Sequence, residues 1–236
     1  MIDKSQRTAA WIAGFALVFG FAVVVFGEFY LVAGLLVPGD AAQTARNILD
    51  HETRFRAYAV CNLLYVLDLV TLISALYVVL KPVSQGLALA AAFLRLIYAL
   101  LWVALVMDLF SALTLLGDAP YLHAVAPDAL QALARAELRG SFDAYYVGLP
   151  FFALASTLSA WLFWKSGYVP KVLAGFGVLA SAWGAACGII YLVFPHFNQT
   201  VSDWLFDTPL GLFEIALGLW LMSKGLRQPG AAPAPR

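Results

Sequence analysis

The sequence predicts an all-α membrane protein: a polytopic helix bundle of six transmembrane helices with both termini in the cytoplasm. Three observations support this fold class. Of the 236 residues, 63% are hydrophobic and only 12% are charged, whereas soluble domains carry about 25% charged residues. The mean hydropathy is +0.85. Several apolar runs also exceed the roughly 18 residues that mark a candidate membrane span.

Pro, Gly and charged residues divide the chain into six apolar segments, which predict the six spans. Their approximate bounds are 9–36, 57–80, 85–117, 142–165, 170–194 and 205–223. The first segment is longer than the roughly 7–15 residues of a signal-peptide core, so we expect it to be a retained span. Residues 1–226 are predicted to form one transmembrane domain. The Pro- and Ala-rich residues 227–236 predict a disordered cytoplasmic tail.

Basic residues are distributed unevenly between the two sides of this predicted bundle. One side, on which Asp3 is the only acid, carries eight of them: Lys4, Arg7, Lys81, Lys165, Lys171, Lys224, Arg227 and Arg236. By the positive-inside rule this side faces the cytoplasm. The connections at about 37–56 and 118–141 then face outward. Each is predicted to contain a short capping helix, the first with Asp40 as its N-cap and the second beginning near Pro127.

Composition and motifs argue against several classes of function. The formal net charge of +0 does not suggest a nucleic-acid partner. Cys61 and Cys187 both lie in apolar segments and are interpreted as small core residues. The sequence contains no P-loop, no G-x-G-x-x-G and no G-x-S-x-G motif. The histidines lack metal-ligand spacing, so neither a metal site nor a cofactor is predicted.

Three stretches of the chain resemble one known family. They are "VPGDAAQTARNILDHETRFR" from Val37 to Arg56, "SGYVPKVLAG" from Ser166 to Gly175 and "EIALGLWLMSKG" from Glu214 to Gly225. In this order they resemble the bacterial domain-of-unknown-function family 4386. The family pattern often has an acid six residues after the arginine, where this chain has Asn62. The resemblance implies a multi-pass protein of the bacterial cytoplasmic (inner) membrane and no particular reaction.

Ionisable residues inside three of the predicted spans are the first candidate site. An acid or base at a helix centre costs roughly 2.5–3.5 kcal/mol on insertion scales. Asp68, Arg95 and Glu214 each lie near the middle of a span, so the three groups share one depth. They form either an ion-paired clasp that fixes helix register or a functional site. Since two carboxylates and one guanidinium sum to −1, we expect one of the acids to hold a proton near neutral pH.

A second set of charged residues lies nearer the outward face. The candidates for a ligand site there are His51, Glu52, Arg56, Asp108 and Asp143, and the alternative is ordinary interfacial charge. Glu28 is expected to lie inside the hydrocarbon, where it would link the two sets.

The leading functional hypothesis is a protein that binds a small lipophilic or amphipathic molecule in an outward-opening cavity, with proton-coupled transport of that molecule as an extension of this hypothesis. The midplane acids would form the floor of this cavity, and its walls would be aromatic: Tyr65, Tyr98, Trp102, Tyr145 and Tyr146. The first alternative is an intramembrane acid–base enzyme, such as an isomerase, cyclase or lipid hydrolase. The second is a structural or stress-related membrane component. Membrane lipids are the expected partners in every case.

Overall fold

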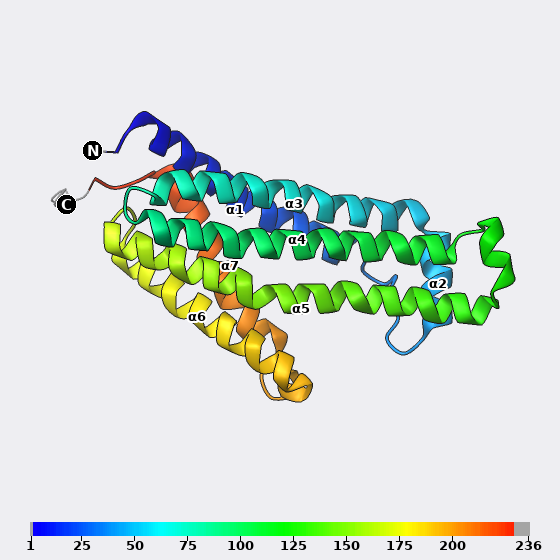
Figure 1. Ribbon diagram of the computed structural model, residues 1–236. Coiled ribbons are helices and arrows are strands. Elements are labelled where there is room, and N and C mark those ends of the chain that lie inside the picture. Colours follow the sequence, from blue (N-terminus) through cyan, green and yellow to red (C-terminus); the bar gives the residue numbers. More distant parts are fainter. Residues whose placement is uncertain (1, 229–236) are drawn as a thin grey trace. The chain divides into compact units, whose positions relative to one another are not determined.

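The computed structural model describes residues 2–228, so residues 229–236 of the predicted tail lie outside the described residues. Within that range the chain is helical and contains no strand, which confirms the all-α prediction (Figure 1). The seven α-helices there are α1 (Lys4–Phe26), α2 (Ala41–Asp50), α3 (Glu52–Leu80), α4 (Gln85–Leu116), α5 (Pro127–Ser166), α6 (Lys171–Val193) and α7 (Asp203–Ser223). Three short helices connect them: η1 (Gly27–Leu31), η2 (Pro120–Ala124) and η3 (Pro195–Gln199).

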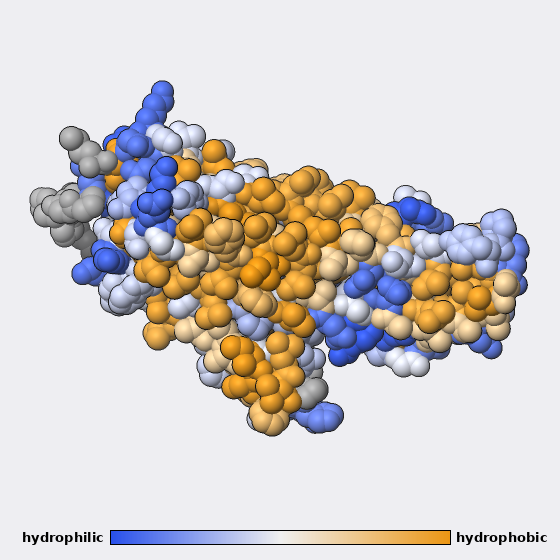
Figure 2. All heavy atoms as spheres, in the orientation of Figure 1, coloured by the Kyte–Doolittle hydropathy of each residue, from blue (hydrophilic) through white to orange (hydrophobic). Residues whose placement is uncertain are grey.

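Five helical segments of the described chain are long and apolar enough to cross a membrane. They are Lys4–Leu31, Glu52–Leu80, Gln85–Leu116, Pro127–Ser166 and Lys171–Val193. Many large hydrophobic side chains on them are exposed, as along the middles of α3 and α4 in Figure 2. These features indicate a multi-pass membrane protein. Helix α7 covers the sixth predicted segment, and the count of six spans stays a prediction.

The first of the two long connections, at about 37–56, contains the short helix that was predicted for it. Helix α2 begins after Asp40, whose side chain accepts a hydrogen bond of 2.8 Å from the backbone N–H of Gln43. Such a cap satisfies one of the N–H groups that a helix leaves without an internal partner at its start. The prediction of a short helix with Asp40 as its N-cap is therefore confirmed.

The second predicted capping helix does not exist as a separate element. Pro127 does begin a helix, but this helix continues to Ser166 as the single 40-residue helix α5. Gly140 stands between the two predicted pieces, and a glycine costs a helix interior only about 1 kcal/mol. Pro150 lies within the helix without ending it. Helix α5 ends just before Gly167, which has a left-handed φ of 68°. The N–H of Gly167 donates a hydrogen bond to the carbonyl of Phe163.

The chain divides into two compact units. Unit 1 comprises Met1–Phe21, Asp68–Ala99 and Val147–Arg236, and unit 2 comprises Ala22–Leu67 and Leu100–Tyr146. The boundary cuts through α1, α3, α4 and α5 rather than through a linker. The single transmembrane domain predicted over residues 1–226 stays a prediction.

In unit 1 the start of α1 and the ends of α3, α5 and α7 meet. The buried Gln6 side chain lies 3.3 Å from the carbonyl oxygen of Val79 and 3.5 Å from the hydroxyl of Tyr168. The backbone N–H of Arg227 donates to the carbonyl of Tyr168 at 2.8 Å. The two ends of the described part of the chain therefore lie at the same end of this unit (Figure 1).

Helices α1 and α7 cross closely in the same unit. A Cβ atom added to Gly218 would lie 2.9 Å from the carbonyl oxygen of Gly14, and one added to Gly14 would lie 2.7 Å from that of Gly218. Small residues allow helix backbones to approach in this way within lipid. The crossing fixes α7, and with it Glu214, against the rest of unit 1.

Candidate functional site

Arg95, Ser156 and Glu214 form a hydrogen-bonded chain across three helices of unit 1. Arg95 Nη2, on α4, donates to Ser156 Oγ, on α5, at 2.7 Å. Ser156 Oγ donates in turn to Glu214 Oε1, on α7, at 3.0 Å. The guanidinium and the carboxylate are also paired directly, with 3.7 Å between Nη2 and Oε1. Together with Asp68 these residues are called the polar cluster below.

The guanidinium of Arg95 is almost completely enclosed. The residue is 3% exposed, and its Cζ atom lies 5.3 Å from the centroid of the Phe152 ring. Tyr98 stacks on Phe152 with a centroid separation of 4.6 Å. An aromatic face stabilises a desolvated cation through its quadrupole. Arg95 Nη1 nevertheless has no hydrogen-bond partner among the described residues.

Asp68 belongs to the same unit and is also buried, at 8% exposure. The charge of Glu214 acts on it through space, so two ionised carboxylates here would repel each other. Within residues 2–228, no hydrogen bond to the Asp68 carboxylate is formed. The polar cluster therefore contains one well-formed ion pair and one buried acid that lacks a comparable partner.

A small cavity adjoins the guanidinium. Its volume is about 10 Å³, and Arg95 and Ser159 line it together with apolar side chains of α3 and α4. A cavity needs roughly 10–15 Å³ to hold one water molecule. The cavity thus matches a single water molecule at most.

Unit 2 holds most of the predicted aromatic wall. Tyr65 packs edge-on against Trp102 at 4.6 Å between ring centroids. Trp102 in turn meets Tyr145 edge-on at 6.3 Å, and Tyr145 lies 5.3 Å from Tyr146. The fifth predicted wall residue, Tyr98, lies in unit 1 beside Arg95, as described above. The structure thus joins four of the five residues in one aromatic cluster.

Glu28 lies in the π-helical turn η1, at the end of the first predicted span. Its Oε1 atom accepts a hydrogen bond of 2.6 Å from the hydroxyl of Tyr58 on α3. Asn62, at the position where the family pattern often has an acid, is buried and donates to the backbone carbonyl of Tyr58 at 2.9 Å. The guanidinium of Arg54 donates to the carbonyls of Tyr30 and Ala33 at 2.8–3.1 Å. Polar contacts from α3 thus secure the backbone where the first helix ends.

The remaining outer candidates are mostly exposed and paired locally. Arg56 bonds to Glu52 at 2.6 Å on the same helix. Asp143 pairs with Arg139, also one turn away, at 3.1 Å. The exposed His51 lies 3.1 Å from the carbonyl oxygen of Asn47. Exposed pairs of this kind contribute little energy. The described residues contain no group of three or more side chains suited to a metal ion.

Asp108, the last of these candidates, lies where α4 and α5 approach within unit 2. A Cβ atom added to Gly140 would lie 3.1 Å from Asp108 Oδ2. The glycine inside α5 thus leaves room for this carboxylate, which is a packing role that the sequence did not indicate.

Ser156 and Phe152 are the site residues that the sequence analysis missed. A serine within an apolar helix is a weak signal, because its hydroxyl often bonds to the backbone of the same helix. Ser159, one turn further on, does this with the carbonyl of Ala155 at 2.8 Å. The available signal was depth, since Ser156 lies near the middle of its predicted span, as Asp68 and Glu214 do.

Neither the curated proteins nor the solved structures contain a significant match to the chain. A family model does match it, over residues 12–225 and hence most of its length. This region includes the polar cluster, the aromatic cluster and all three stretches on which the resemblance was based. The chain therefore belongs to the family described as Domain of unknown function (DUF4386).

Proposed function

We propose that the chain crosses the bacterial cytoplasmic membrane six times, with both termini in the cytoplasm. The meeting of Gln6, Val79, Tyr168 and Arg227 at one end of unit 1 supports this topology, because an even number of crossings returns the chain to the side where it began. The basic residues at that end indicate the cytoplasmic side. Labelling single cysteines at Thr200 and Ser223 from each side of the membrane tests this topology.

We propose further that the protein binds a small lipophilic or amphipathic molecule and that the polar cluster exchanges a proton when it does so. One observation carries this proposal: the cluster is buried but incompletely paired. Arg95 Nη1 has no hydrogen-bond partner within the described part of the chain, and the same holds for the Asp68 carboxylate.

A purely structural clasp would be expected to close its hydrogen bonds. Buried polar groups cost free energy when they lack partners, and a partly satisfied network is worse than an apolar core. Asp68 adds a second negative charge to a site that already has a balanced ion pair. A proton or a donor from a bound molecule removes that imbalance. Intramembrane acids of this kind are typical of proton relays and transport sites.

Infrared spectroscopy of the reconstituted protein tests the proton directly. At pH 7 we expect the absorption of one protonated carboxylic acid, which disappears in Asp68→Asn or in Glu214→Gln. The control is Asp143→Asn, an exposed acid outside the polar cluster, which should leave the absorption unchanged. If both buried acids are ionised at pH 7, the proposal is wrong.

The bound molecule is sought by mass spectrometry of protein purified from membranes in mild detergent. We expect a lipophilic molecule that co-purifies with the wild type and is depleted in Arg95→Gln, whereas Arg46→Gln, a change at an exposed arginine of α2, retains it. A carrier then shows pH-gradient-dependent uptake of that molecule into proteoliposomes. The enzyme alternative predicts product formation from a lipid extract, lost in Glu214→Gln. A structural component shows neither.

A further inference from the structure

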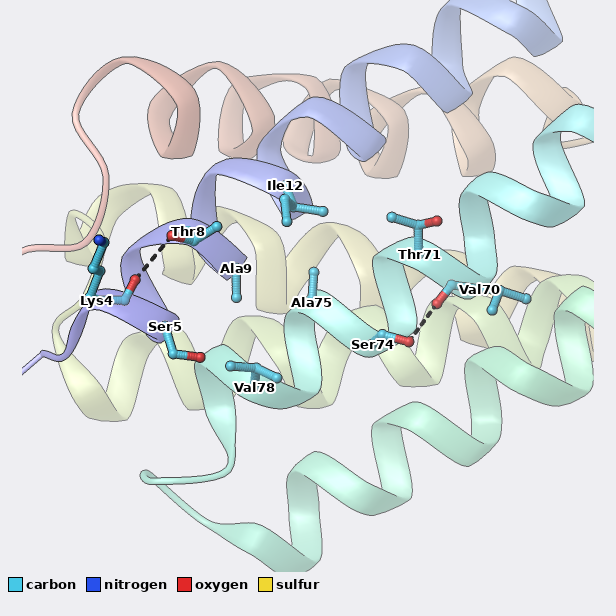
Figure 3. Close-up of a pocket in the computed structure, with 10 residues that line it drawn as sticks. All are labelled: Lys4, Ser5, Thr8, Ala9, Ile12, Val70, Thr71, Ser74, Ala75 and Val78. Atoms are coloured by element: carbon cyan, nitrogen blue, oxygen red, sulfur yellow. Dashed lines mark hydrogen bonds between the residues drawn. The ribbon is translucent and has the colours of Figure 1, made fainter.

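A long groove runs between the first half of α1 and the second half of α3, both within unit 1. It is lined by residues of α1 between Lys4 and Ile12 and residues of α3 between Val70 and Val78, and its volume is about 740 Å³ (Figure 3). Sites for small molecules typically measure about 300–1,000 Å³. We propose that this α1–α3 groove binds an anionic phospholipid, with the phosphate at Lys4 and an acyl chain along the groove.

The charged end of the groove fits a phosphate group. Lys4 is the first residue of α1 and of the membrane-span candidate Lys4–Leu31, so it lies where hydrocarbon meets headgroups. Its neighbour Ser5 is exposed, and the Ser5 hydroxyl makes no hydrogen bond to any described residue. The adjacent acid, Asp3, accepts a hydrogen bond of 2.7 Å from the N–H of Gln6 and caps the helix. An ammonium and a hydroxyl without a partner among the described residues thus lie at the same end of the groove.

The rest of the groove fits a hydrocarbon chain. Thr8 Oγ1 donates to the carbonyl of Lys4 at 3.1 Å, and Ser74 Oγ donates to that of Val70 at 2.9 Å (Figure 3). These hydroxyl protons are already bound to the helix backbone, so the two side chains offer no free donor to a ligand. The buried methyl groups of Ala9 and Ala75 leave the floor of the groove open to a chain.

The length and position of the groove favour a lipid over a soluble anion. From Lys4 to Ile12 the helix advances eight residues and rises by about 12 Å, close to the roughly 15 Å depth of one leaflet of hydrocarbon. Val70, near the inner end of the groove, is 48% exposed, so the groove opens sideways to the bilayer. A lipid enters from the leaflet without leaving it, whereas a soluble anion would meet only the single ammonium at the end. None of the four polar-cluster residues lines the groove, and the proposal does not rest on their protonation.

Binding of defined lipids to the delipidated full-length protein in dodecyl maltoside, measured by native mass spectrometry, tests the proposal. We expect dioleoyl phosphatidylglycerol to bind more tightly than phosphatidylcholine with the same chains. Lys4→Gln should weaken phosphatidylglycerol binding about fivefold, the effect of one basic residue near an anionic lipid. The matched control Lys171→Gln, which removes an exposed lysine from the start of α6, should not.

Variants that fill the groove test the binding of the acyl chain independently of the binding of the phosphate by Lys4. Ala75→Leu should abolish binding of both lipids, and Ala90→Leu, at an exposed position on α4, should leave it unchanged. Because Ala75 is buried, Thr8→Leu at the exposed wall provides a second variant that spares the core. Equal affinity for the two lipids, equal effects of Lys4→Gln and Lys171→Gln, or full binding by both groove variants would overturn the proposal. Asp68→Asn should not affect lipid binding, so failure here and failure of the proton proposal are distinguishable.

Discussion

Asp68 and Glu214 should partly replace each other as the negative charge that balances Arg95. Arg95 Nη2 lies 3.7 Å from Glu214 Oε1, a distance at which two unit charges attract by about 4.5 kcal/mol if the effective dielectric constant is about 20. Removing one partner of a buried pair costs about 3–5 kcal/mol, because the other charge is left uncompensated. That cost is expected here only when no second carboxylate remains in the polar cluster.

A double-mutant cycle measures this. Glu214→Gln alone should lower the free energy of unfolding by only about 1–2 kcal/mol, since Asp68 keeps one negative charge in the polar cluster. Asp68→Asn alone should be neutral or stabilising, because it removes a buried acid while the ion pair between Arg95 and Glu214 stays intact. The double variant should lose the full 3–5 kcal/mol or so, because Arg95 is then buried without any carboxylate.

Unfolding by sodium dodecyl sulphate in lipid–detergent micelles, followed by tryptophan fluorescence, provides the free energies. Asp3→Asn serves as the control change, because Asp3 is an acid outside the polar cluster whose carboxylate accepts a hydrogen bond from the N–H of Gln6 at the start of α1. In combination with Glu214→Gln its effect should be additive. If Asp68→Asn and Glu214→Gln are also additive within about 0.5 kcal/mol, the two acids do not share Arg95 and the reasoning is refuted.

Three further predictions concern the fold. Gly218→Ala should destabilise the protein by about 1–3 kcal/mol in the same unfolding assay, because its Cβ atom would lie 2.9 Å from a backbone oxygen of Gly14. Gly86→Ala is the control, because a Cβ atom added there would have no described atom within 4 Å, and it should stabilise α4 by about 0.5–1 kcal/mol. Equal effects of Gly218→Ala and Gly86→Ala would refute the close crossing of α1 and α7. Asp40→Ala should cost about 1 kcal/mol and speed amide exchange in α2, whereas Asp40→Asn should restore slow exchange. Arg54→Gln should cost about 2–3 kcal/mol and expose η1 to proteolysis, and an unchanged cleavage pattern would contradict the capping role of the guanidinium.

The sequence predicts those features of the fold that depend on local pattern or on depth. Long apolar runs predict the helices, and Asp40 predicts the start of α2. Arg95 and Glu214 each lie near the middle of a predicted span, and charged groups at the same depth in a helix bundle have few other polar partners. This was the reason to expect the two residues to be neighbours, and they lie 3.7 Å apart. The same reasoning did not find Ser156, since a helical serine usually satisfies itself on its own backbone.

Features that depend on which helix faces meet could not be predicted. The α1–α3 groove exists because Ala9 and Ala75 lie on facing sides of two helices, and the sequence fixes neither their rotation nor their separation. The continuity of α5 was also missed. The charged residues 127–139 and the apolar residues 142–165 differ in composition, so the sequence predicts two separate helices. The chain between them contains no residue that ends a helix, and the two stretches therefore form one helix.

The length of α5 has a mechanical consequence. Its 40 residues rise by about 60 Å, twice the roughly 30 Å of bilayer hydrocarbon. If α5 crosses the bilayer, about half of it lies outside the hydrocarbon, and that half belongs to the same continuous helix as Ser156. Pro150, six residues before Ser156, has no backbone N–H to donate to the helix, so α5 would bend at this residue. The residues of α5 outside the hydrocarbon are thus linked to Ser156, and through its hydrogen bond to Arg95, by one continuous helix and not by a loop.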